Sequence, residues 1–135
     1  MKITLDNHGL LPEKAHKEDA GFDLLSPYPF IIPPGDHIMI DTGVHVEIPD
    51  GCYGAIKNRS SMFKAGIVTD GTIDRGYTGP VKIVLHNIGK DIKEIKPKDK
   101  VAQLVVCPFL DCDLEVVDEL KETDRGNGGF GSTGR

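Results

Sequence analysis

The sequence predicts an all-β protein, built as one antiparallel barrel or sandwich with one short helix. Three observations predict this class. Apolar residues recur at every second position over short stretches, and turn-forming residues separate those stretches. The chain of 135 residues also holds 16 glycines and 9 prolines, which leaves little room for long helices. Hydrophobic residues make up 39% of the chain, enough for one core, so we expect a single folded domain.

Three stretches show the alternation of a strand with one buried face: residues 38–48, 53–57 and 81–85. A fourth strand is expected over 101–107, a continuous apolar run interrupted only by Gln103. Turn-forming residues lie before or between them, at 33–36 (PPGD), 49–51 (PDG) and 96–100 (KPKDK). Proline presets its own backbone angle and glycine tolerates positive φ, so these segments predict tight turns. Close spacing of such strands favours antiparallel pairing.

One or two helical turns are expected at residues 60–65, where one of the two leading serines would cap the start. Gly66 would end this helix, because glycine readily takes the left-handed conformation there. A last strand is expected at 114–117, although residues 116–122 suit a helix as well, and periodicity does not decide over so short a stretch.

The C-terminal segment 125–135 holds five glycines in eleven residues. Composition alone favours a disordered tail. However, Arg125, Phe130, Ser132 and Thr133 would also suit a clamp that grips phosphate and stacks on a base. We therefore divide the chain into a domain over 1–124 and a flexible arm over 125–135.

Two polar clusters stand near the expected strand ends. In the first, two carboxylates, Asp19 and Asp23, flank a glycine, which suits either a turn or a polar site. In the second, Arg59 precedes Ser60 and Ser61 where a strand leads into the helix. This second pattern fits phosphate binding and a plain helix start about equally well.

The segment 71–79 (GTIDRGYTG) predicts one arm and the bend of a hairpin. Asp74 could orient and deprotonate a water molecule, and Tyr77 offers a ring to a sugar or a base. An ordinary glycine-rich turn is the alternative. Gln103 interrupts an apolar run, so its amide must either join a structural network or face a ligand.

Charge and composition exclude several classes of function. Lys and Arg number 16 against 21 Asp and Glu, a net charge of −5, so we expect no nucleic-acid partner. No apolar run approaches the roughly 18 residues of a membrane span, and the N-terminus does not resemble a signal peptide. Three cysteines, an odd and sparse set, suit reduced thiols in the cytoplasm. Phosphate-loop, dinucleotide and nucleophile-elbow motifs are absent from the sequence.

Five segments in order resemble the five motifs of the homotrimeric deoxyuridine triphosphatase (dUTPase) family. They are 20–24 (AGFDL), 59–62 (RSSM), 71–79 (GTIDRGYTG), 98–104 (KDKVAQL) and 125–134 (RGNGGFGSTG). The resemblance implies a jelly-roll-like β-barrel (β-clip) subunit and a trimer with active sites shared between subunits. It also implies hydrolysis of dUTP to dUMP and pyrophosphate, by water attack at the α-phosphorus, with Mg²⁺ on the triphosphate.

The same resemblance implies a role for each matched residue. Asp74 would activate the water, Tyr77 would pack under the deoxyribose, and Asp23 would lie near metal-bound water. The remaining substrate contacts it implies are Arg59, Ser60, Ser61 and Gln103 for phosphate, the backbone near Thr72, Ile73 and Lys82 for uracil, and Arg125, Phe130, Gly131, Ser132 and Thr133 from the arm.

Two other functions remain open at this point. A dCTP deaminase shares the barrel and the Arg-Ser-Ser segment, but it needs a catalytic glutamate on the strand after the tyrosine hairpin. Residues 80–87 contain no glutamate, which disfavours deamination. A dUTP-binding regulatory protein is the other alternative.

Overall fold

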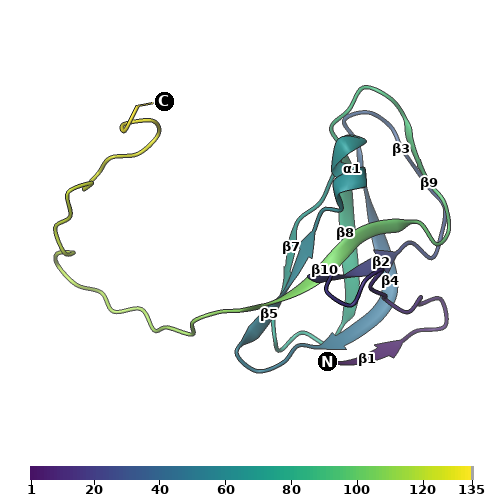
Figure 1. The fold of residues 1–135 in the computed structure, drawn as a ribbon, viewed down its shortest axis with the longest axis horizontal. Coiled ribbons are helices and arrows are strands. Elements are labelled where there is room, and N and C mark those ends of the chain that lie inside the picture. Colours follow the sequence, from purple (N-terminus) through teal and green to yellow (C-terminus); the bar gives the residue numbers. More distant parts are fainter. Residues whose placement is uncertain (135) are drawn as a thin grey trace.

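The computed structural model describes residues 1–134, so Arg135, the last residue of the expected arm, lies outside the described residues. It contains ten strands and one short helix (Figure 1). The elements are β1 (Lys2–Leu5), β2 (Gly21–Leu25), β3 (Phe30–Ile32), β4 (His37–Glu47), β5 (Cys52–Lys57), α1 (Ser60–Lys64), β6 (Ile67–Val68), β7 (Gly71–Ile73), β8 (Pro80–Asn87), β9 (Lys93–Ile95) and β10 (Lys100–Pro108). The expected all-β fold with one helix is confirmed.

The strands form two four-stranded sheets and one two-stranded sheet, with antiparallel pairing throughout. The strand orders are β1-β4-β8-β6, β2-β10-β5-β7 and β3-β9. The second sheet matters most for the site, because β5 leads into α1 and β7 leads into the loop before β8.

The core follows from alternation along the strands. In β8, Val81, Ile83 and Leu85 are buried, whereas Lys82 and His86 on the other face are exposed. The same pattern on neighbouring strands joins one apolar cluster from both four-stranded sheets. Removing this surface from water is the main stabilising contribution to the barrel.

The three strands expected from alternation are confirmed as β4, β5 and β8, and the strand expected from the continuous apolar run is confirmed as β10. Alternation did not identify β1, β3, β6 and β9, which have only 4, 3, 2 and 3 residues. Stretches this short hold too few alternate positions to stand out, and their pairing with other strands determines them.

The helix is also confirmed, but the expected serine cap is wrong. Arg59 occupies the N-cap position and makes no side-chain cap hydrogen bond, while Ser60 and Ser61 are the first two helical residues. Gly66 follows the helix with a φ of 81° and donates its N–H to the Phe63 carbonyl at 3.0 Å. Its expected role as the helix stop is therefore confirmed.

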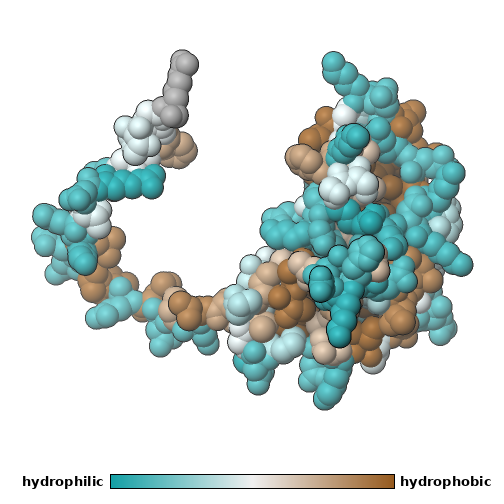
Figure 2. Space-filling model, viewed as in Figure 1, coloured by the Kyte–Doolittle hydropathy of each residue, from teal (hydrophilic) through white to brown (hydrophobic). Residues whose placement is uncertain are grey.

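Beyond Pro108 the chain leaves the barrel and runs outward as a long extended segment, whose last part is the expected arm over 125–135 (Figure 1). Neither the expected strand at 114–117 nor the alternative helix over 116–122 is present, so both predictions are wrong for the single chain. Leu114 and Val116 are 97% and 99% exposed, because this segment lies beside no other strand. Apolar and polar groups alternate along the arm in Figure 2. Within the described residues, no helix is both long enough and apolar enough to cross a membrane.

Candidate active site

The first polar cluster lies where β2, β10 and the start of α1 meet. Arg59 donates its Nε–H to Asp23 Oδ1 at 2.9 Å, and Lys100 Nζ lies 3.0 Å from Asp23 Oδ2. The Asp23 side chain is only 13% exposed, so this is a protected ion pair. Lys100 also lies 3.3 Å from Glu13. Its hydrogen bonds to Asp23 and then Glu13 raise the pKa of the Lys100 ammonium.

Gln103 completes this cluster from β10. Its side-chain amide donates to the Asn58 carbonyl at 2.9 Å. A Cβ at position 21 would come within 2.6 Å of Gln103 Oε1, so a larger residue there would displace this amide. The shallow cavity that results, about 240 Å³, is lined by Ala15, Asp19, Ala20, Gly21, Asp23, Arg59, Ser60 and Gln103. The structure thus brings together the guanidinium, a hydroxyl and the amide, a combination that suits an anion such as phosphate.

A second, larger cavity lies beside the β7–β8 loop. It measures about 690 Å³ and is lined by Gly51, Tyr53, Thr72, Asp74, Arg75, Gly76, Phe109 and Asp111. The exposed Asp74 follows β7 directly, and its carbonyl accepts the Tyr77 N–H at 3.0 Å, which closes the turn. An exposed carboxylate at the rim of a cavity can bind and orient a water molecule.

Tyr77 lies in the turn that follows Asp74. Its hydroxyl donates to the Pro80 carbonyl at 2.8 Å. A Cβ at position 79 would come within 2.6 Å of the tyrosine hydroxyl, so only glycine lets the ring lie this close to the backbone. The ring remains partly exposed and offers a flat surface for a sugar or a base.

Two residues expected near uracil have different surroundings. Ile73 is 6% exposed and packs in the core, so only its backbone is available to a ligand. Lys82 does not line the cavity that Thr72 and Asp74 line. It pairs with Asp41 on the exposed face of the other four-stranded sheet, because β8 turns its odd-numbered residues inward. The structure does not bring the Lys82 side chain to Thr72.

The arm residues lie far from both cavities in the single chain (Figure 1). Arg125 donates its Nε–H to the Gly128 carbonyl at 2.8 Å, and Ser132 donates its backbone N–H to the Gly129 carbonyl at 3.1 Å. Phe130 and Gly131 have positive φ angles of 49° and 85°. Phe130, Ser132 and Thr133 are exposed, so their side chains contact neither the Arg59 cluster nor the Asp74 cavity.

The Arg59 cluster determines how a divalent cation could bind there. Mg²⁺ prefers oxygen ligands in octahedral geometry and keeps several of its waters. Both oxygens of Asp23 already contact cations, Arg59 and Lys100, so direct coordination would displace one of them. The residues therefore suit a cation that keeps its own waters better than one that Asp23 coordinates directly.

Sequence reasoning missed several residues that shape these cavities. Lys100 and Glu13 extend the Asp23 ion pair. The Asn58 side chain accepts the Thr69 N–H at 2.7 Å and donates to the Ile67 carbonyl at 2.8 Å, so it fastens the chain around α1. Lys100 stands within the matched segment 98–104 and could have been noted there. No local pattern points to Glu13, which meets Asp23 through an isolated bridge.

A guanidinium-and-hydroxyl cluster and an exposed carboxylate beside a tyrosine, carried on one β-barrel, are groups that suit a phosphate-handling protein. A model of the dUTPase family matches residues 7–134, and the chain belongs to this family. A deoxyuridine 5'-triphosphate nucleotidohydrolase of Clostridioides difficile is 42% identical over 134 residues, covering 96% of this chain and 94% of the relative.

Solved structures agree with the family assignment and with its jelly-roll-like fold. A point mutant of the Staphylococcus bacteriophage 80alpha dUTPase, with dUpNHpp, superimposes with a TM-score of 0.92 and 27% identity, covering 99% of this chain and 98% of that one. A point mutant of the dUTPase from phage phi11 of S. aureus, described with a structural Mg(II) ion, has a TM-score of 0.81 and 28% identity, covering 87% and 96%.

Proposed function

We propose that this enzyme hydrolyses dUTP to dUMP and pyrophosphate, with Asp74 as the group that activates water. The exposed Asp74 carboxylate at the rim of the 690 Å³ cavity is the observation that carries the proposal. The Asp74 carboxylate takes a proton from water as the oxygen attacks the α-phosphorus. A new oxygen–phosphorus bond forms, and the bond to the pyrophosphate leaving group breaks.

The substrate is held by groups of three kinds. Arg59, Ser60, Ser61 and Gln103 neutralise and orient phosphate oxygens. The Tyr77 ring lies against the deoxyribose and leaves no room for a 2′-hydroxyl. Backbone groups of Thr72 and Ile73 read the uracil edge, with the backbone near Lys82 as the facing partner, so a base with other donors would lose hydrogen bonds.

The enzyme works as a homotrimer whose active sites combine residues of different subunits. Separation of the Asp74 cavity, the Arg59 cluster and the arm within one chain supports this arrangement. The exposed apolar side chains of Leu114, Val116 and Leu120 also favour a cover supplied by another copy. In this arrangement the arm over 125–135 brings Arg125, Ser132, Thr133 and Gly131 to the γ-phosphate and Phe130 to the uracil, and this role is the reason for the proposed division at 124.

Magnesium bound to the triphosphate would offset its negative charge and orient the leaving group. Asp23 reaches water on this ion, and Arg59 keeps Asp23 in place at 2.9 Å. We place the enzyme in the cytoplasm, where its three free cysteines stay reduced.

The decisive experiment offers purified protein dUTP, dCTP, dTTP and UTP and measures pyrophosphate release. We expect release from dUTP alone, and equal release from dCTP would contradict the proposed base reading.

Asp74→Asn should lower kcat by about two orders of magnitude while dUTP binding persists, because the proton acceptor is lost. Asp50→Asn, also exposed near the same cavity, is the matched control and should keep kcat. Full activity of Asp74→Asn would refute the role of Asp74.

A further inference from the structure

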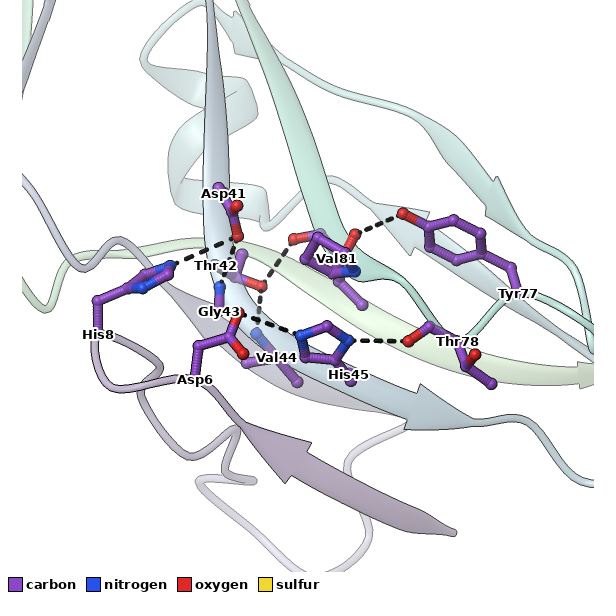
Figure 3. Close-up of polar contacts among 11 residues, drawn as sticks. Asp6, His8, Asp41, Thr42, Gly43, Val44, His45, Tyr77, Thr78 and Val81 are labelled. Atoms are coloured by element: carbon purple, nitrogen blue, oxygen red, sulfur yellow. Dashed lines mark hydrogen bonds and ion pairs between the residues drawn. The ribbon is translucent and has the colours of Figure 1, made fainter.

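His45 lies on β4 just beyond a break in its pairing with β8. The register shifts between Asp41 and His45, and Gly43 between them has a φ of 67°. Asp41 Oδ1 accepts the Gly43 N–H at 2.9 Å. Thr42 Oγ1 accepts the Val44 N–H at 3.2 Å. These side chains fix the bulge, and the His45 ring after it lies between two other segments of the chain (Figure 3).

Both ring nitrogens of His45 have partners. Nδ1 lies 2.8 Å from the Thr78 carbonyl, and Nε2 lies 3.1 Å from Asp6 Oδ2. A carbonyl and an ionised carboxylate can only accept hydrogen bonds, so both nitrogens must donate. The ring that makes both bonds is therefore an imidazolium. In agreement, the Thr78 and then the Asp6 hydrogen bonds raise the pKa of His45.

Thr78 belongs to the loop that carries Asp74 and Tyr77. The Tyr77 N–H bonds the Asp74 carbonyl within this loop, and the Tyr77 hydroxyl bonds the carbonyl of Pro80, the first residue of β8. These bonds shape the turn and join it to the strand that directly continues it, but they do not join it to the segment after β1. The ion pair between Arg75 and Asp50, at 3.3 Å, does reach outside the loop, but Asp50 is 97% exposed and such pairs contribute little.

We propose that His45 is a positioning residue, which in its protonated form ties the loop carrying Tyr77 and Asp74 to Asp6 after β1. The consequence for catalysis rests on the proposed function, whereas the tie itself does not. A fixed Thr78 holds the neighbouring Tyr77 ring where the deoxyribose must lie. No part of this role requires His45 to touch the substrate.

The charges around His45 favour its protonated form. Asp6 contacts it from the segment after β1, and Asp41 acts on it from β4. Lys2 and Glu47, 3.6 Å apart, line the same hollow as His45 and Thr78 and largely offset each other. Lys82 and His8 act on Asp41 from β8 and from the N-terminal segment. One carboxylate, Asp6, thus contacts the ring, and a second, Asp41, acts on it at longer range.

The pH dependence follows from the raised pKa of His45. The tie is complete below the unfolded value of about 6.5 and is lost as the pH rises through the higher folded value. Neutral imidazole keeps one N–H, so it can donate a hydrogen bond to Thr78 or to Asp6 but not to both. We expect kcat/KM for dUTP in the wild type to decline as the pH rises through the folded pKa of His45. This decline is the alkaline step that the variants test.

Three variants test the proposal on the full chain. His45→Gln should lower kcat/KM at pH 6.5 by about threefold to tenfold, the range for one lost hydrogen bond, and remove the alkaline step. Asp6→Asn should keep kcat/KM and lack the step, because an amide NH₂ can donate to the neutral ring while Nδ1–H still bonds Thr78. His37→Gln, exposed at the other end of β4, is the control and should match the wild type.

Two readouts do not depend on catalysis. NMR should show His45 titrating above about 6.5, and amide exchange over residues 75–79 should accelerate in His45→Gln but not in His37→Gln. An ordinary or lowered pKa, or unchanged exchange in His45→Gln, would overturn the tie. A wild type that does not hydrolyse dUTP would refute the proposed function, and these two readouts would still decide the role of His45. Unchanged kcat/KM in His45→Gln with altered exchange would refute positioning.

Discussion

At the scale of single residues, Asp23 joins two cations that would otherwise repel each other. Its two oxygens contact Arg59 and Lys100 at 2.9 and 3.0 Å. Asp23→Asn removes the charge but keeps the size, and it leaves two cations close together at a largely covered position. We expect a loss of about 1–3 kcal/mol in the free energy of unfolding, measured by urea denaturation.

The matched control for Asp23 is Asp70, which lies 3.5 Å from Lys57 with 81% of its side chain exposed. Asp70→Asn should change the free energy of unfolding by no more than about 0.5 kcal/mol, because solvent screens such a pair. Equal losses in the two variants would show that burial of the Asp23 pair adds no stability.

The sequence identified the residues of the site far better than their contacts. Arg59, Asp74 and Tyr77 lie within distinctive motifs, and the matched segments located them. Glu13 and His45 belong to no motif, because each acts through a partner distant in sequence. Asp6 and His45 are separated by 39 positions, and only the pairing of β1 with β4 brings them together.

At the scale of elements, the bulge in β4 needs a glycine at position 43. A Cβ there would lie 2.8 Å from backbone atoms of Gly9, and φ is already positive. Gly43→Ala combines a clash with backbone strain, so we expect a loss of about 3 kcal/mol or more in the free energy of unfolding. Thermal and urea denaturation measure this loss.

Gly35 separates the two causes of that loss. It has a φ of 77°, but a Cβ added there meets nothing within 4 Å. Gly35→Ala should therefore lose only about 1 kcal/mol, the cost of left-handed backbone for alanine. Similar losses at both positions would show that the contact between Gly43 and Gly9 has no part in stability.

Strand prediction from the sequence depended on the length of the alternating pattern. β4, with 11 residues, alternates long enough to be recognised, whereas the 9-residue β10 is recognised from its continuous apolar run. The stretch 114–117 also alternates, yet it forms no strand in the single chain. A strand needs a partner for its backbone groups, and alternation alone does not show whether the same chain supplies one.

At the scale of the whole molecule, each chain holds parts of the proposed site that do not meet. Asp74 and Arg59 line different cavities, and the arm runs away from both. The resemblance of five motifs predicted a shared site, whereas composition and periodicity carry no information about assembly. A complete site then depends on the proposed contacts between copies.

Mixed trimers test this sharing directly. Asp74→Asn and Arg59→Gln chains should each be nearly inactive alone. When equal amounts are refolded together, each site draws Asp74 from one subunit and Arg59 from another, and each position has an even chance of being intact. About one quarter of the sites should then be complete, so dUTP hydrolysis should recover to about one quarter of the wild-type rate. A chain ending at residue 124, refolded with Asp74→Asn, should recover activity in the same way. If one chain supplied both residues to its own site, the mixture would stay as inactive as its parents, because every site would keep one defect.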